Sequence, residues 1–108
     1  MDPEQKNRAL LTDLYELTMS AAYHEQDMNQ PAAFEMFIRS PERRSYMVTA
    51  GLQHVLSYLE SLEFTGDQID YLRSLPVFQD VDEDFWEYLA DFSFTGSIRA
   101  VPEGTVVF

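Results

Sequence analysis

The stretch from Leu10 to Ala21, which reads L-L-T-D-L-Y-E-L-T-M-S-A, places the strongest constraint on the fold. Apolar side chains recur there at helical spacing and cover much of the circumference, so we expect a largely buried helix that ends near Gln26. Asp13 suits the N-cap, and Glu16 is in place as the reciprocal partner of a capping box. Two neighbouring stripes make up the apolar surface: Leu10, Leu14, Leu17 and Ala21, and beside them Leu11, Tyr15, Thr18 and Ala22.

Four later segments have the composition of β-strands. Residues 33–39 (A-F-E-M-F-I-R) alternate between two faces, which predicts a strand. Residues 40–45 break it with proline and charge, and residues 46–49 predict a second, short strand. Residues 97–100 and 105–108 flank V-P-E-G, a sequence suited to a tight turn, so they predict a hairpin.

Three further helices are predicted in the middle of the chain. The first spans about 52–62 after a turn at Ala50-Gly51. The second spans 68–75, opens at Thr65 and is ended by Pro76. The third spans 84–91, capped by Asp82 or Asp84, and its Trp86 is expected in the core or at a domain interface. Helices and strands mix without regular alternation, so the predicted class is α+β, with a loose arm at 1–8 and one domain at 9–108.

Composition excludes several classes of protein. The net charge is −12, from 19 acidic and 7 basic residues, and such a surface repels nucleic acid and anionic lipid. No apolar run approaches the roughly 20 residues that span a bilayer, and the N-terminus has no apolar signal region. The chain has no cysteine, which excludes disulfides and thiolate chemistry and points to the cytoplasm. We therefore expect no nucleic-acid partner and no membrane.

Few residues suggest chemistry on their own. His24 and His54 have no metal-ligand spacing and the four glycines form no phosphate loop, so we predict no catalytic residue and no metal ligand. Tyr15 could stack on a flat ligand, although core packing is the simpler interpretation. For Asp13, likewise, a helix cap is the simpler interpretation. Arg39 could hold a phosphate or be an exposed charge at a strand end.

The basic residues are concentrated in one place. Arg39, Arg43 and Arg44 lie within six positions and make up nearly half of the basic side chains. In so acidic a chain, this cluster is where an anionic ligand would bind.

Taken together, four blocks resemble the N-terminal region of nicotinate phosphoribosyltransferases. They occur in the family's order, and the resemblance covers about residues 9–108. The blocks are L-T-D-L-Y-E-L-T-M (11–19), F-E-M-F-I-R (34–39), A-G-L-Q-H-V-L-S-Y-L (50–59) and D-F-S-F-T-G-S-I-R-A-V-P-E-G-T-V-V-F (91–108).

The resemblance implies an enzyme of pyridine nucleotide salvage. The family couples nicotinate to phosphoribosyl pyrophosphate, forming nicotinate mononucleotide and pyrophosphate, with ATP hydrolysis assisting and Mg²⁺ on the phosphates. It also implies an α+β domain of helices on short, mainly antiparallel strands, docked on an irregular α/β barrel. Members form homodimers, carry a phosphorylated histidine in the barrel, and place the site between subunits.

The resemblance also assigns three substrate-binding residues. Tyr15 corresponds to the tyrosine of T-D-x-Y, which stacks on the pyridine ring in the neighbouring subunit's site. Asp13 corresponds to the motif aspartate, near the ring or holding the helix start. Arg39 closes the F-E-x-F-x-R strand and would face phosphates. The turn after it, S-P-E-R-R-S, departs from the family's less charged, glycine-containing turn, so Arg43 and Arg44 are additional candidates.

Length limits what these 108 residues do alone. The barrel, the phosphorylated histidine and the main donor-binding residues have no counterpart here, and the sequence stops inside an apolar strand. We therefore expect one inactive part of the enzyme, with no cofactor bound by these residues. The alternatives are a non-catalytic acidic module that docks on a larger partner, and a sister enzyme for nicotinamide or quinolinate.

Overall fold

The structure, a computed structural model, describes residues 8–39 and 42–108. Almost all of the predicted N-terminal arm lies outside these residues. In chain order the elements are α1 (Leu14–Glu25), β1 (Met47–Val48), α2 (Leu52–Glu60), α3 (Gly66–Ser74), the short 3₁₀ helix η2 (Pro76–Phe78), α4 (Glu83–Ala90) and β2 (Val106–Val107). All four predicted helices are confirmed, with ends within two residues of the expected ones.

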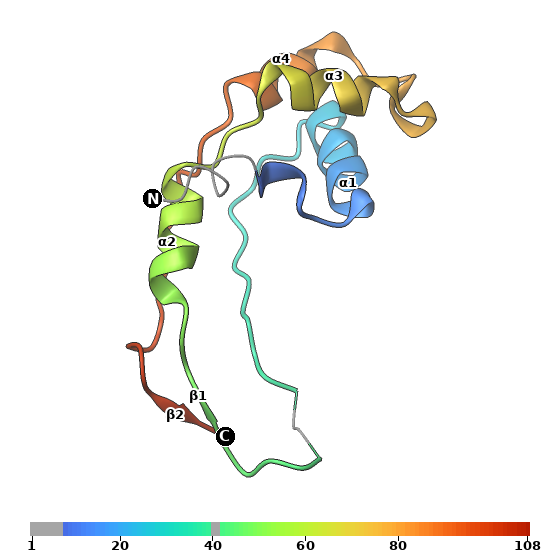
Figure 1. The fold of residues 1–108 in the computed structure, drawn as a ribbon. Coiled ribbons are helices and arrows are strands. Elements are labelled where there is room, and N and C mark those ends of the chain that lie inside the picture. Colours follow the sequence, from blue (N-terminus) through green and yellow to red (C-terminus); the bar gives the residue numbers. More distant parts are fainter. Residues whose placement is uncertain (1–7, 40–41) are drawn as a thin grey trace.

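The molecule is elongated, with helices at one end and a small β-ribbon at the other (Figure 1). Its Cα radius of gyration is 16.9 Å and its extents are 48 × 30 × 26 Å. A compact domain of about 100 residues has a radius of gyration near 13 Å. The radius of gyration is larger here because α2 and two long connections span the distance between the two ends (Figure 1). Neither α2 nor these connections contribute a residue to the buried core.

The core lies between α1, α3, η2 and α4. Phe85 is 1% exposed, and Trp86 contacts it at 5.3 Å between ring centroids and Phe78 at 5.5 Å. The expected burial of Trp86 is confirmed. The buried cluster consists of Leu17, Ile69, Leu72, Phe78, Phe85, Trp86 and Leu89. Helices α3 and α4 supply five of these seven residues, so they organise this end of the molecule.

Local signals explain the position of α3. The Thr65 hydroxyl accepts a bond from the Gln68 N–H (3.3 Å), and the Gln68 side chain accepts one from the Thr65 N–H (2.9 Å), which completes a capping box. Arg73 then joins α3 to α4 through two bonds to Glu83, of 2.7 and 2.8 Å, while its guanidinium lies 5.8 Å from the centre of the Trp86 ring.

The sheet differs from the prediction in its pairing. β1 confirms the predicted strand at 46–49, but it pairs antiparallel with β2, Met47 opposite Val107 and Val48 opposite Val106. The predicted hairpin between 97–100 and 105–108 is wrong, because 97–100 form no strand. The tight turn itself exists: the Thr105 N–H binds the Pro102 carbonyl (3.2 Å) and Gly104 has φ 81°. A turn fixes where the chain reverses, and here the returning strand meets β1 instead.

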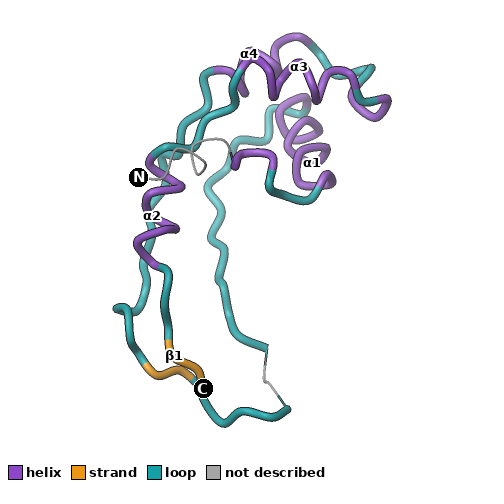
Figure 2. The backbone as a smooth tube through the Cα atoms, viewed as in Figure 1, coloured by secondary structure: helices purple, strands orange, loops and turns teal. Residues whose placement is uncertain are grey.

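Three further expectations are corrected. Residues 33–39 run extended but form no strand, because no other strand lies beside them to complete a ladder (Figure 2). Helix α1 is mostly exposed, and Leu17 is its only buried residue. Asp13 does occupy its N-cap, yet no side-chain capping bond forms there. Four helices and a two-stranded antiparallel sheet are consistent with the small α+β domain that we predicted.

Candidate functional site

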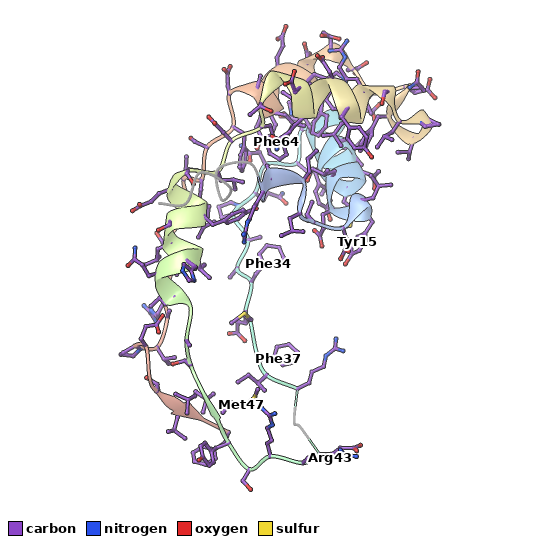
Figure 3. All side chains as sticks on the ribbon, viewed as in Figure 1. Tyr15, Phe34, Phe37, Arg43, Met47 and Phe64 are labelled. Carbon is purple, nitrogen blue, oxygen red and sulfur yellow. The ribbon has the colours of Figure 1, made fainter. Side chains whose placement is uncertain are left out.

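Tyr15 lies at the second residue of α1, and its side chain is 58% exposed. Figure 3 shows the ring projecting from the start of the helix, away from the core between α1, α3 and α4. The interpretation of Tyr15 as a core residue is therefore wrong for the described chain. An exposed ring in the first, fixed turn of a helix can present one face to a flat ligand.

Charge at the start of α1 disfavours ionisation of this phenol. The Glu16 carboxylate, and after it that of Asp13, raises the pKa of Tyr15 above its ordinary value, because a phenolate beside a carboxylate is disfavoured. Asp13 has extended backbone (φ −77°, ψ 140°) and an exposed side chain that makes no bond to the helix. Both side chains are thus available to a partner beyond the described chain.

Arg39 is exposed at the end of the extended segment. Arg43 is also exposed and lies near β1, at the opposite end of the molecule from Tyr15 (Figure 3). The structure therefore keeps Asp13 and Tyr15 together on α1 and separates them from the arginine cluster. Within one copy of the described chain, the three predicted site residues do not form one site.

A cavity of about 490 Å³ lies between α1, the end of α2 and α4. Aromatic residues far apart in sequence line it, among them Tyr23, Tyr58 and Tyr88, with Glu16 and Asp27 as the acidic groups. Neither Tyr15, Asp13 nor Arg39 lines it. No local motif indicates this cavity, because its walls come from segments joined only by tertiary packing.

The described residues include no group of three or more His, Cys, Asp or Glu side chains that could hold a metal ion. His24 instead packs its ring 5.1 Å from Tyr88 and 5.8 Å from Phe85. In this part of the chain no helix is both long and apolar enough to cross a membrane.

Comparison with known proteins decides the family. Residues 10–108 match the family described as nicotinate phosphoribosyltransferase (NAPRTase) N-terminal domain. The chain belongs to this family. The nicotinate phosphoribosyltransferase match includes all four blocks singled out in the sequence, which confirms the resemblance.

Curated nicotinate phosphoribosyltransferases align over nearly the whole chain. Nicotinate phosphoribosyltransferase pncB2 of Mycobacterium tuberculosis is 46% identical over 101 residues, which is 93% of this chain and 21% of that protein. The nicotinate phosphoribosyltransferase of Caenorhabditis elegans is 39% identical (92% of this chain, 18% of that one), and that of Mus musculus is 37% identical (94% and 19%). The chain spans about a fifth of the length of these relatives.

Proposed function

We propose that the chain is the N-terminal part of a nicotinate phosphoribosyltransferase, a cytoplasmic enzyme of NAD salvage. The enzyme would form nicotinate mononucleotide and pyrophosphate from nicotinate and phosphoribosyl pyrophosphate, assisted by ATP hydrolysis. The family match over residues 10–108 is the observation that carries this proposal. The relatives are about five times as long, which supports a role as one domain that docks on a barrel supplied elsewhere in the polypeptide.

Tyr15 is proposed to stack on the pyridine ring of nicotinate, with Asp13 beside it. The exposure of the ring, the neutral phenol and the position in the first turn of α1 support this role. Stacking orients a flat nucleophile before reaction, and this lowers the entropic part of the barrier.

Arg39 is proposed to contact phosphates, with Arg43 and Arg44 as further cations. The reaction develops positive charge on the ribose while anionic pyrophosphate leaves, and guanidinium groups stabilise the departing charge. Because Arg43 and Tyr15 lie at opposite ends of the molecule, one copy does not bring both to one substrate pair (Figure 3). The separation supports a homodimer in which Tyr15 of one subunit completes the site of the other.

ATP and Mg²⁺ are proposed to be held outside these residues. The described chain has no cluster of metal ligands. When bound, Mg²⁺ would neutralise phosphate charge. The phosphorylated histidine is likewise proposed to lie in the barrel, since the His24 ring packs on Phe85 and Tyr88.

The proposal is tested with the open reading frame that encodes these residues. We expect the product of the frame read past Phe108 to convert nicotinate, phosphoribosyl pyrophosphate, ATP and Mg²⁺ into nicotinate mononucleotide, measured by chromatography. The 108-residue chain alone is expected to give no product. A frame that stops at Phe108, or a longer product that makes no mononucleotide from nicotinate, would refute the assignment.

A second candidate function is a non-catalytic acidic assembly module. Its support is the large apolar side chains that are exposed to solvent: Phe34 is 93% exposed, Met36 98% and Phe37 76%. Such side chains mark surfaces that another protein covers. A stop codon after Phe108, together with a stably associated second polypeptide, favours this alternative.

A further inference from the structure

The cavity between α1, the end of α2 and α4 lies outside the proposed substrate site, because none of Tyr15, Asp13 and Arg39 lines it. Its volume of about 490 Å³ falls within the range of small-molecule pockets, which runs from about 300 to 1,000 Å³. A cavity of this size that the proposed reaction does not use is a candidate site for a further ligand.

Aromatic rings form much of the cavity wall, and three of them come from different helices: Tyr23 from α1, Tyr58 from α2 and Tyr88 from α4. Ring contacts hold one side of the wall together. The centroid of the Tyr88 ring lies 6.1 Å from that of Phe92, which lies 5.9 Å from that of Phe64, at the helical end of the molecule (Figure 3). Aromatic rings attract cations through the negative potential of their faces, so this wall favours a cationic ligand.

The acidic side chains at the cavity, Glu16 and Asp27, are not balanced by basic ones. Of the lining residues that the structure describes, none is lysine or arginine. The last turn of α1 and the loop after it also contribute to the wall, and carbonyl groups at the end of a helix carry partial negative charge. These groups repel nicotinate and phosphates, the anionic substrates of the proposed enzyme, and attract a cation.

The backbone holds Asp27 at the cavity in an uncommon conformation. Its φ of 54° lies in the left-handed region. Two hydrogen bonds fix this turn: the Asp27 N–H donates to the His24 carbonyl (3.1 Å), and the Met28 N–H donates to the Tyr23 carbonyl (2.8 Å). Glycine is the usual residue at this position of a helix end. An aspartate there places at the cavity a negative charge that glycine would not supply.

We propose that this cavity binds an organic ammonium ion with apolar substituents, such as a quaternary amine. The alkyl groups of the ion contact the tyrosine rings, and the Glu16 and Asp27 carboxylates offset its charge. The proposal goes beyond the enzymatic assignment, because no residue of the proposed substrate site takes part and its test measures binding without turnover.

Choline is the probe, and its uncharged carbon isostere, in which a tert-butyl group replaces trimethylammonium, isolates the effect of charge. In NMR titrations of the chain, we expect choline to shift the ring signals of Tyr58 and Tyr88 and to bind at least about tenfold more tightly than the isostere. Tyr71, which is exposed on α3 and does not line the cavity, should not shift. Equal affinity for the isostere, or no shift at Tyr58 and Tyr88, would overturn the proposal.

Glu16→Gln with Asp27→Asn removes both carboxylates and should weaken choline binding about fivefold. Asparagine also tolerates the left-handed conformation, so the turn is kept. Glu87→Gln with Asp70→Asn is the matched control, since it changes the net charge equally through exposed side chains outside the cavity. The control should retain its affinity, and an equal loss in both variants would contradict the proposed site. Trp86 fluorescence reports whether the core is intact, since Trp86 is buried.

The same titration with the product of the frame read past Phe108 identifies the source of the cation. Choline that binds both polypeptides supports a free small-molecule ligand. Binding to the 108-residue chain alone would overturn the proposal, since another segment of the longer polypeptide would then fill the cavity. If a variant fails to fold, the comparison of choline with its isostere on the unmodified chain decides.

Discussion

The environment of Tyr15 determines whether its ring packs in the core or can contact a ligand. Its helical spacing suits a core position, whereas exposure to solvent suits stacking on a ligand. Tyr15 is 58% exposed, which favours the second interpretation. Neighbouring carboxylates, led by that of Glu16, raise the pKa of Tyr15 further above neutral pH, where a phenol is already uncharged. A neutral, exposed ring held by a helix is suited to contact an aromatic acid.

We predict that Tyr15→Ala in the complete enzyme raises the Kd for nicotinate roughly ten- to a hundred-fold, the scale of a lost aromatic stack. Tyr15→Phe keeps the ring and should retain most of the affinity. Calorimetric titration with nicotinate measures both. Tyr71→Ala is the matched control, since Tyr71 is 57% exposed on α3. Unchanged affinity in folded Tyr15→Ala would remove Tyr15 from the site.

The N-cap residues of α1 and α3 differ in whether their side chains form a capping hydrogen bond. Thr65 completes a capping box with Gln68, whereas Asp13 occupies an N-cap without a side-chain bond. We expect Thr65→Ala to lower the free energy of unfolding by about 1 kcal/mol, within a range of about 0.5–2 kcal/mol. Asp13→Ala should cost less than half as much. Urea denaturation of the two variants makes the comparison, and an equal loss in both would contradict it.

The link between α3 and α4 predicts a dependence of stability on pH. The hydrogen bonds from Arg73 lower the pKa of Glu83. A carboxyl whose pKa is lower in the folded state stabilises the fold above its unfolded pKa, and loses this contribution as the pH falls through the folded value. Wild type should therefore exceed Glu83→Gln in urea midpoint at neutral pH, and the small difference should vanish in acid.

A second pair of variants isolates the ion pair. In an Arg73→Gln background, Glu83→Gln should change the midpoint equally at neutral and acid pH, because the carboxylate no longer has its guanidinium partner. The same measurement at high salt should shrink the wild-type difference, since both side chains are solvent-accessible. A pH-dependent difference that persists without Arg73 would assign the effect to another group.

On the scale of the whole molecule, stability is concentrated at the helical end. The buried cluster comes from α1, α3, η2 and α4, while β1, β2 and α2 contribute nothing to it. The ribbon end is instead held by a few hydrogen bonds: the Gly104 N–H binds the Thr49 carbonyl (2.8 Å), and the Leu52 N–H binds the Glu103 carboxylate (2.5 Å).

Phe85→Ala tests this distribution. Phe85 is 1% exposed, so its truncation should cost about 3–5 kcal/mol of unfolding free energy, a large part of the total for a domain of this size. Tyr71→Ala should change stability by no more than about 0.5 kcal/mol. Thermal melts followed by circular dichroism compare the two. A Phe85→Ala protein that melts like wild type would show that stability lies elsewhere.

The four helices could be predicted because their signals are local. Thr65 and Gln68 set one helix start, Pro76 sets an end, and Gly51 adopts the left-handed conformation before α2. The four blocks at 11–19, 34–39, 50–59 and 91–108 likewise indicated the family through their residue order. The exposure of α1 could not be predicted in this way. Apolar residues at helical spacing define one face of a helix, but they do not show which other segment covers that face.

The amino-acid sequence by itself determined the helices, the tight turn before β2, the acidic surface and the family, since each depends on neighbouring residues or on residue order. Only the tertiary structure decided that β2 pairs with β1, that residues 33–39 lie unpaired, and that Tyr15 and the arginine cluster stand at opposite ends. The physical reason is that strand partners and surface exposure depend on contacts between distant segments. Local periodicity constrains the backbone but leaves those contacts open.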